Sequence, residues 1–408
     1  MNINPTVIAI PIYFLLIGFE FIVLRLKKHK SYRLKDAMTN INCGVVSQIT
    51  GAFLLVTLFS AYTLIEEKFG FFNIPIVWWA FPLAFVFFDF MYYWAHRLSH
   101  EINLFWGGHS VHHQSEEYNL SVALRQSSTQ ILWTFLFYLP LALAGIDPIV
   151  FITSQGLNLV YQFWIHTESI KKMPRWFEFI FNTPSHHRVH HARNPKYIDK
   201  NHAGTLIIWD RLFKTFEKED EPPHYGITKP LKSWNPVWAN FAHYSAILSD
   251  LKRVPSVKDK VRLLFKKPGW KPEYMGGFEK APDIDPAYEK FENRTSVRLN
   301  FYVSFQFLVL MTSTMFFLYY VNELEISKKI ISALFIIFSV ASFGFLFENR
   351  KWSRLIEFIR LIAVPIAFIS LFYSKWLTVA SLIAIAYLII SLIWFIQIKG
   401  RLDLLAQK

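Results

Sequence analysis

The amino-acid sequence predicts an all-α, polytopic integral membrane protein with about nine transmembrane helices. Hydrophobic residues make up 53% of the 408 residues, whereas charged residues make up only 18%. Nine apolar runs approach or exceed the roughly 20 residues that a helix needs to cross a bilayer. The single cysteine, Cys43, excludes an intrachain disulfide framework and cysteine-held zinc or iron–sulfur sites.

The apolar runs fall into two groups separated by one long polar region. The first group comprises residues 7–24, 41–65, 76–94, 131–146 and 149–165. The second group comprises residues 301–321, 330–347, 355–373 and 377–396. This pattern predicts three parts: an N-terminal transmembrane bundle (1–165), a cytoplasmic cap (166–300) and C-terminal transmembrane helices (301–408).

The basic residues predict the orientation of the helices. Six Lys and Arg side chains follow the first run within residues 25–35, and Asp36 is the only acid near them. The positive-inside rule places this loop in the cytoplasm, and alternation then places 95–128 and 166–300 there too. Topology and anionic lipid explain the net charge of +13, so we expect no nucleic-acid partner. The membrane is either a bacterial inner membrane or the endoplasmic reticulum.

The distribution of histidines carries most of the functional information. Ten of the 14 histidines lie beside predicted membrane exits on one side: His96, His100, His109, His112, His113, His166, His186, His187, His190 and His191. Residues three or four apart share a helix face, so these spacings direct several imidazoles toward common points. Packing so many rings together without a metal would leave unpaired polar atoms, whereas neutral imidazole binds Zn, Cu, Fe or Ni well. Because the rings outnumber the positions around one ion, we predict two metals on the cytoplasmic side.

The chemistry of the setting favours iron over zinc. A dinuclear zinc hydrolase would normally use bridging carboxylates, and none stands at ligand spacing. The His-Glu-x-x-His motif of a metalloprotease fails, because Leu104 occupies the position of its second histidine. Alkyl chains in a bilayer offer only unactivated C–H bonds, which require activated dioxygen. A metal-binding or transport protein is a further alternative, but it would carry ionisable residues along several spans.

Three histidine motifs resemble the eight-histidine signature of the fatty acid hydroxylase/sterol desaturase superfamily. They are HRLSH at 96–100, HSVHH at 109–113 and HRVHH at 187–191. Within that superfamily the chain is similar to the alkylglycerol monooxygenases. The segments that carry this similarity include FWIHTE at 163–168, NTPSHHRVHHARN at 182–194 and DKNHAGTLIIWDRLF at 199–213. The similarity covers about residues 80–217.

This resemblance implies a membrane monooxygenase with a di-iron centre, which uses O₂ and tetrahydrobiopterin. Such an enzyme hydroxylates the ether-adjacent carbon of an alkylglycerol from the bilayer, giving a fatty aldehyde plus glycerol or a glycerol lipid. The alternative is a sterol or fatty-acyl hydroxylase or desaturase of the same superfamily, which would need an electron-donor protein. The residues themselves display no pterin-binding motif.

The resemblance also implies a set of metal ligands. By matching position they are His96, His100, His109, His112, His113, His187, His190 and His191. His166 is the expected ninth ligand, by analogy with hydroxylases whose metals take extra histidines. His186 is either a ligand or a neighbour of one.

Three further side chains are candidates for supporting roles. Glu101 and Asn119 are predicted catalytic residues, because ligating histidines usually donate their second N–H to a carboxylate or carbonyl. The alternative for Glu101 is an ion pair with Arg97 on the same helix face. Asp89 lies inside the third apolar run and should face the protein interior, since a carboxylate is costly in lipid.

Overall fold

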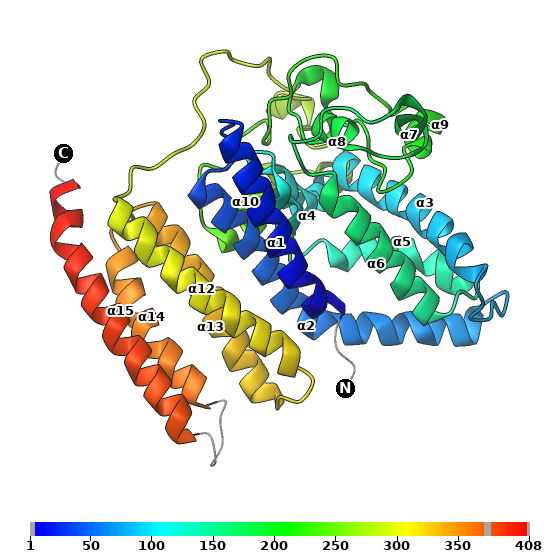
Figure 1. Ribbon diagram of the computed structural model, residues 1–408. Helices are drawn as coiled ribbons and strands as arrows, with labels where there is room; N and C mark the ends of the chain where they lie inside the picture. The colour runs from blue at the N-terminus through cyan, green and yellow to red at the C-terminus, as the bar shows by residue number, and fades with distance from the viewer. Residues whose placement is uncertain (1–4, 371–376, 406–408) are drawn as a thin grey trace. The chain divides into compact units, whose positions relative to one another are not determined.

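The computed structural model describes residues 5–370 and 377–405, and within these ranges it contains helices but no β-strand (Figure 1). The only extended pairings there are three isolated bridges. The chain divides into two compact units. We call Phe14–Leu231 with Ala239–Lys290 the histidine unit, and Met1–Tyr13, Lys232–Trp238 and Phe291–Lys408 the C-terminal unit.

The histidine unit is built from six long or medium helices and several short ones, besides most of α1 (Pro5–Leu26). The longer helices are α2 (Leu34–Phe69), α3 (Ala80–Glu101), α4 (Asn103–His113), α5 (Ile131–Leu143), α6 (Pro148–Trp164) and α10 (Pro236–Arg253). The first three residues of α10 belong to the C-terminal unit. The shorter helices are α7 (Arg175–Ile180), α8 (Pro184–His190), α9 (Ile208–Leu212) and α11 (Val257–Phe265). Single 3₁₀ turns lie at η1 (Leu120–Leu124), η2 (Pro195–Tyr197) and η3 (Glu273–Met275). Helix α3 is central, because it packs against α4, α5 and α6.

The C-terminal unit contains α12 (Val297–Tyr320), α13 (Ile326–Phe347), α14 (Ser353–Ser370) and α15 (Leu377–Leu405). A buried ion pair lies among these apolar helices, with Arg360 Nη2 2.6 Å from Glu357 Oε1. Arg360 also donates to Gln306 of α12 and Tyr387 of α15, while Ser342 of α13 donates to Glu357. One polar network therefore joins all four helices, as polar side chains do between helices in membranes.

Each of the nine predicted apolar runs overlaps one helix. The run 76–94 begins four residues before α3, and residues 371–373 of the run 355–373 lie outside the described residues. Within the described ranges, four helices are long and apolar enough to cross a membrane: Leu34–Phe69, Val297–Tyr320, Ile326–Phe347 and Leu377–Ile398. This supports an integral membrane protein. Helix α5, with 13 residues, is shorter than its predicted run, because the chain turns at Gly145, whose φ is +76°.

Two glycines allow α4 to enter the interior of the histidine unit. A Cβ atom on Gly107 would lie 2.4 Å from the ring of Tyr244 in α10, and one on Gly108 would lie 2.3 Å from the ring of Trp133 in α5. No larger residue fits without moving an aromatic ring, and overpacking of this kind is costly. The glycines thus let α4 pack closely against α5 and α10, just before its histidines.

The buried carboxylate of Asp89 connects α3 to the polar region. Its side chain is 0% exposed, which confirms the predicted inward orientation. It accepts hydrogen bonds from the backbone N–H groups of Thr205 (2.7 Å) and Leu206 (2.9 Å), from the indole of Trp209 (2.9 Å) and from Asn158 of α6 (2.6 Å). One carboxylate therefore joins α3, α6 and residues 205–209.

Candidate metal centre

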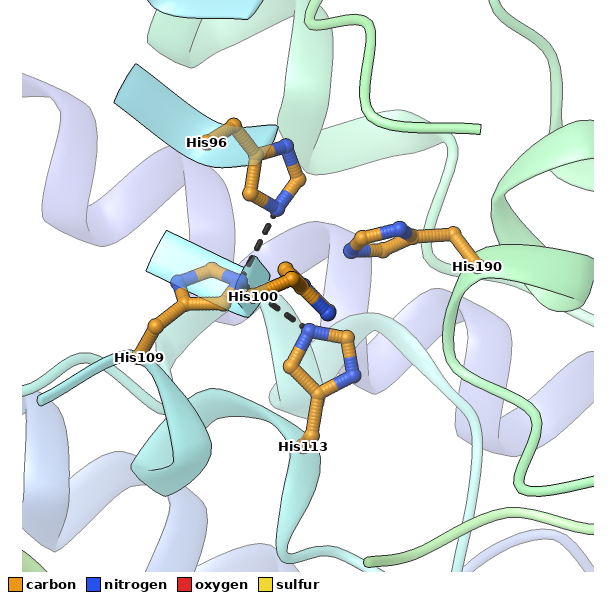
Figure 2. Close-up of side chains that lie close together, drawn as sticks. All are labelled: His96, His100, His109, His113 and His190. Atoms are coloured by element: carbon orange, nitrogen blue, oxygen red, sulfur yellow. Dashed lines mark hydrogen bonds between the residues drawn. The ribbon is translucent and has the colours of Figure 1, made fainter. Parts of the chain in front are cut away.

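Nine histidines converge in two buried groups in the histidine unit. The first group is His96 and His100 of α3, His109 and His113 of α4, and His190 of α8 (Figure 2). The second group is His112 of α4, His166 after α6, and His187 and His191 at the end of α8. Within each group, one ligand-type nitrogen per ring lies within 4.8 Å of all the others. The structure thus brings together all nine histidines predicted as metal ligands.

Helix geometry explains how the motifs divide between the groups. Successive residues on an α-helix are turned by about 100°, so residues four apart point the same way and adjacent residues do not. His96 pairs with His100, and His109 with His113, in the first group. The adjacent histidines at 112 and 113 enter different groups, as do those at 190 and 191. The rings of His113 and His191 stack 4.4 Å apart, so the two groups adjoin.

Backbone carbonyls orient many of the rings from behind. The Nδ1 atom donates to a carbonyl oxygen at four histidines: His96 to His202 (2.6 Å), His112 to Arg125 (3.0 Å), His166 to Gln162 (2.7 Å) and His190 to Lys200 (2.9 Å). The Nδ1 atom of His109 lies 3.2 Å from the side-chain oxygen of Gln130. Because the proton is on Nδ1 in each donating ring, the Nε2 lone pair is free to bind a metal.

The inward nitrogens fit bound metal ions. Nε2 of His109 lies 2.9 Å from Nε2 of His96 and 3.1 Å from Nε2 of His113. Nε2 of His166 lies 3.2 Å from Nε2 of His112 and 3.0 Å from Nε2 of His187. Among the described residues, the buried Nε2 atoms of His100, His190 and His191 have no hydrogen-bond partner. Unpartnered buried nitrogens are costly, and a cation between the lone pairs would satisfy them.

Burial keeps these imidazoles neutral, which is the form that binds metals. Removal from water lowers the pKa of His112 to about 4 and the pKa of His190 to about 3. The pKa of His96 is lowered well below its usual value, first by burial and then by the neighbouring rings of His190 and His109. The remaining members of both groups have pKa values lowered for the same main reason.

The lowered pKa values predict an acid-sensitive metal-free protein. An unfolded histidine titrates near a pKa of about 6.5, whereas the pKa in the folded chain is lower, so the unfolded state binds more protons below that pH. The contribution of the neutral rings to the free energy of unfolding is therefore fully present above a pH of about 6.5. It is lost progressively as the pH falls toward the folded pKa values, which are about 4 for His112 and about 3 for His190. We expect the thermal midpoint of metal-free protein to fall by about 5 °C or more between pH of about 7.5 and 5.5. A midpoint unchanged over this interval would contradict neutral burial of the rings.

The two predicted catalytic residues lie outside both groups. Glu101 forms an ion pair with Arg97, with 3.1 Å between Oε1 and Nε, which is the alternative that the sequence left open. Asn119 caps η1, since its side-chain oxygen accepts from the backbone N–H of Ser121 (3.0 Å) and its amide donates to the carbonyl of Ser31 (2.5 Å). A catalytic role for either residue stays a prediction. His186 is also buried outside the groups, with its ring against Phe216.

Two residues beside the groups were not predicted from the sequence. Tyr118 stacks on His166 with ring centroids 5.8 Å apart, and its hydroxyl donates to the carbonyl of Ile165 (3.0 Å). Gln130 supports His109 from a position 21 residues further along the chain. The distance in sequence between either residue and a histidine motif does not indicate a contact. Tyr118 gives a weak signal, because it follows the second motif closely, and Gln130 gives none.

Comparison with known proteins places the chain in a family. The fatty acid hydroxylase family model matches residues 81–215, which contain all nine histidines of the two groups. Alkylglycerol monooxygenase from Homo sapiens is 40% identical over 358 residues, covering 86% of this chain and 80% of that protein.

The corresponding enzymes of two other vertebrates are similar to the chain over comparable lengths. Alkylglycerol monooxygenase from Xenopus tropicalis is 37% identical, covering 85% of this chain and 78% of that protein. Alkylglycerol monooxygenase from Danio rerio is 36% identical, covering 97% of this chain and 90% of that protein. No solved structure matches the chain. Because similarity of this degree extends along most of both chains and includes the histidine motifs, the protein belongs to the alkylglycerol monooxygenase family and is an oxidoreductase of the monooxygenase class.

Proposed function

We propose that the two histidine groups hold two iron ions, and that the protein hydroxylates the ether-adjacent carbon of alkylglycerols. The observation that carries this proposal is the convergence of nine buried histidines in two adjoining groups. Imidazole ligands suit zinc, copper, iron and nickel, but zinc has no redox chemistry to offer a monooxygenase. When bound, iron would supply the activation of dioxygen that acid–base side chains cannot provide. The relatives named alkylglycerol monooxygenase support the choice of substrate.

The proposed reaction balances with a two-electron reductant. One oxygen atom of O₂ enters the C–H bond beside the ether oxygen, and the other leaves as water with two protons. A tetrahydropterin supplies the two electrons, in line with the resemblance to the family. The hemiacetal that results breaks its C–O bond, so that a fatty aldehyde and glycerol or a glycerol lipid are released.

The chain's own residues hold the site in place and keep water away. Backbone carbonyls fix the rings of His96, His112, His166 and His190, so the inward nitrogens are oriented before any ion binds. All nine rings are buried, which keeps the reacting region dry. These residues therefore supply orientation and exclusion of water, while the redox chemistry comes from the bound metal.

We also propose that the site lies at the cytoplasmic face of a nine-helix membrane part, with residues 166–300 covering it and residues 301–408 forming the C-terminal transmembrane helices. The basic residues 25–35 support this orientation. The alkyl chain would enter sideways from a bacterial inner membrane or the endoplasmic reticulum. Labelling of single cysteines introduced into residues 25–30, in intact cells or sealed vesicles, tests the side, because native Cys43 is buried.

The test of function is aldehyde release by purified protein in lipid nanodiscs. With a 1-alkylglycerol, O₂ and tetrahydrobiopterin, we expect fatty aldehyde to appear and metal analysis to find two irons per chain, one for each group. A 1-acylglycerol is the matched control, because its ester has no ether-adjacent CH₂ on the chain side. Iron-loaded protein that releases no aldehyde would contradict the substrate proposal. Mass spectrometry of products from sterols and fatty acyl lipids, with a protein electron donor, tests the alternative reaction of the superfamily.

A further inference from the structure

A tenth histidine, His202, lies beside the first group but is not one of the nine proposed ligands. The side chain of His202 is 0% exposed. Both of its ring nitrogens are buried, and neither makes a well-aligned hydrogen bond with the residues that the structure describes, although the backbone of Asp199 lies beside the ring. A neutral imidazole always presents one N–H donor and one lone pair, and leaving both unsatisfied in the interior is costly. Such a ring indicates a partner that the protein chain itself does not supply.

The position of His202 points to the first histidine group. Its ring centroid lies 5.0 Å from that of His100, 5.7 Å from that of His190 and 5.8 Å from that of His96. All three neighbouring rings are members of the first group. The ring of Tyr93 is the next aromatic neighbour, at 6.3 Å.

The backbone of His202 fixes its ring in this place. Its N–H donates to Oδ1 of Asp210 (2.8 Å), and its carbonyl accepts from Nδ1 of His96 (2.6 Å). The N–H of Ala203 donates to the other oxygen of Asp210 (2.8 Å). The residue that orients the ring of His96 therefore also holds its own imidazole against the same group.

His202 lies beside the ligand cluster and is not part of it. Five other histidines make up the first group, and the nitrogens of His202 do not join their 4.8 Å cluster. An ion with octahedral geometry takes six ligands, so five imidazoles would leave one position for a small molecule from outside. A buried N–H near such a position is well placed to hold that molecule by a hydrogen bond.

We propose that His202 is a positioning residue that donates a hydrogen bond to the small exogenous ligand, water or an anion, at the open position of the first centre. The proposal rests on the proposed function in one respect, because it requires metal ions in the histidine groups. It requires neither the alkylglycerol substrate nor the pterin. Its failure can therefore be told apart from failure of the proposed reaction.

The experiment is a titration of the full-length, iron-loaded, oxidised protein with sodium azide, followed by visible absorption. We expect His202→Phe to keep the iron content of the wild type but to bind azide about tenfold or more weakly, as loss of a hydrogen bond to a charged group predicts. His202→Gln, which keeps an N–H donor, should recover part of the affinity. His243→Phe is the matched control, since His243 is a partly buried histidine bonded to Asn103 away from both groups.

Three outcomes would overturn the proposal. The first is an azide affinity of His202→Phe equal to that of the wild type, and the second is a wild-type protein that binds no azide. The third is loss of iron from His202→Phe but not from His243→Phe, which would make His202 a ligand. If His202→Phe does not fold, a measurement on the wild type alone still tests the proposal. The vibrational stretching band of bound azide should shift when H₂O is replaced by D₂O. An unshifted band would contradict the hydrogen bond.

Discussion

His109→Ala is expected to abolish aldehyde release and to leave the protein with no more than one iron. His109 is the central ring of the first group, because its Nε2 atom lies within 3.1 Å of the Nε2 atoms of both His96 and His113. Its removal opens the group between α3 and α4. Changes to residues that only support metal ligands typically cost 10–100-fold, so loss of a ligand should lower the rate by more than about 100-fold. Aldehyde release and metal analysis on the same preparation check both expectations.

Gln130→Ala provides a graded comparison with His109→Ala. Gln130 contacts His109 only through the outer nitrogen, Nδ1, at 3.2 Å. We expect iron affinity to fall by about 10–100-fold, with activity largely restored when iron is in excess. The exposed His224, replaced by alanine, controls for the loss of a histidine as such.

Two results would contradict this account of the first group. His109→Ala with two irons and normal activity would remove His109 from the ligand set. An effect of His109→Ala on metal flux across the membrane, with oxygen consumption unchanged, would favour the transport alternative over the oxygenase.

The grouping of histidines within each motif could be predicted from the sequence, because it depends on short-range helix geometry. His96 and His100 lie on one face of α3 wherever that helix packs, and the same holds for His109 and His113 on α4. His166 joins from another element: the predicted topology placed it on the same side of the membrane, and the family resemblance made it the ninth expected ligand. Local spacing thus predicts which rings point together, whereas meeting of the motifs depends on tertiary packing.

The residues that support the site could not be predicted, because their contacts span large distances in the chain. His202 lies 106 residues from His96, whose ring it orients, and Asp89 lies 116 residues from Thr205. Helix boundaries also depended on context. The apolar pattern of the third run ends at residue 94, but α3 continues to Glu101, since backbone hydrogen bonding does not stop where lipid-facing residues do.

Asp89→Ala is expected to prevent accumulation of folded, iron-loaded protein. The substitution leaves two backbone N–H groups, the indole of Trp209 and the amide of Asn158 buried without their acceptor. Each unsatisfied donor costs about 1–3 kcal/mol, so the combined loss amounts to a large part of a typical folding free energy. Size-exclusion chromatography and thermal unfolding in detergent measure the effect. Asp147→Ala is the matched control, because Asp147 only caps α6 at a partly exposed position and should cost about 1 kcal/mol.

Asp89→Asn distinguishes a local effect on the metal centre from a general loss of stability. The amide keeps one acceptor oxygen but turns an NH₂ group toward donors, so part of the protein should still fold. Asp89 lies on α3 two turns before His96, and residues 205–209 follow His202, whose carbonyl holds the ring of His96. Loosening this connection disturbs the first group directly, whereas the histidines of the second group come from α4, from α8 and its end, and from the end of α6. Folded Asp89→Asn protein should therefore lose about half of its iron, and a proportional loss from both groups would mean that Asp89 acts on stability alone.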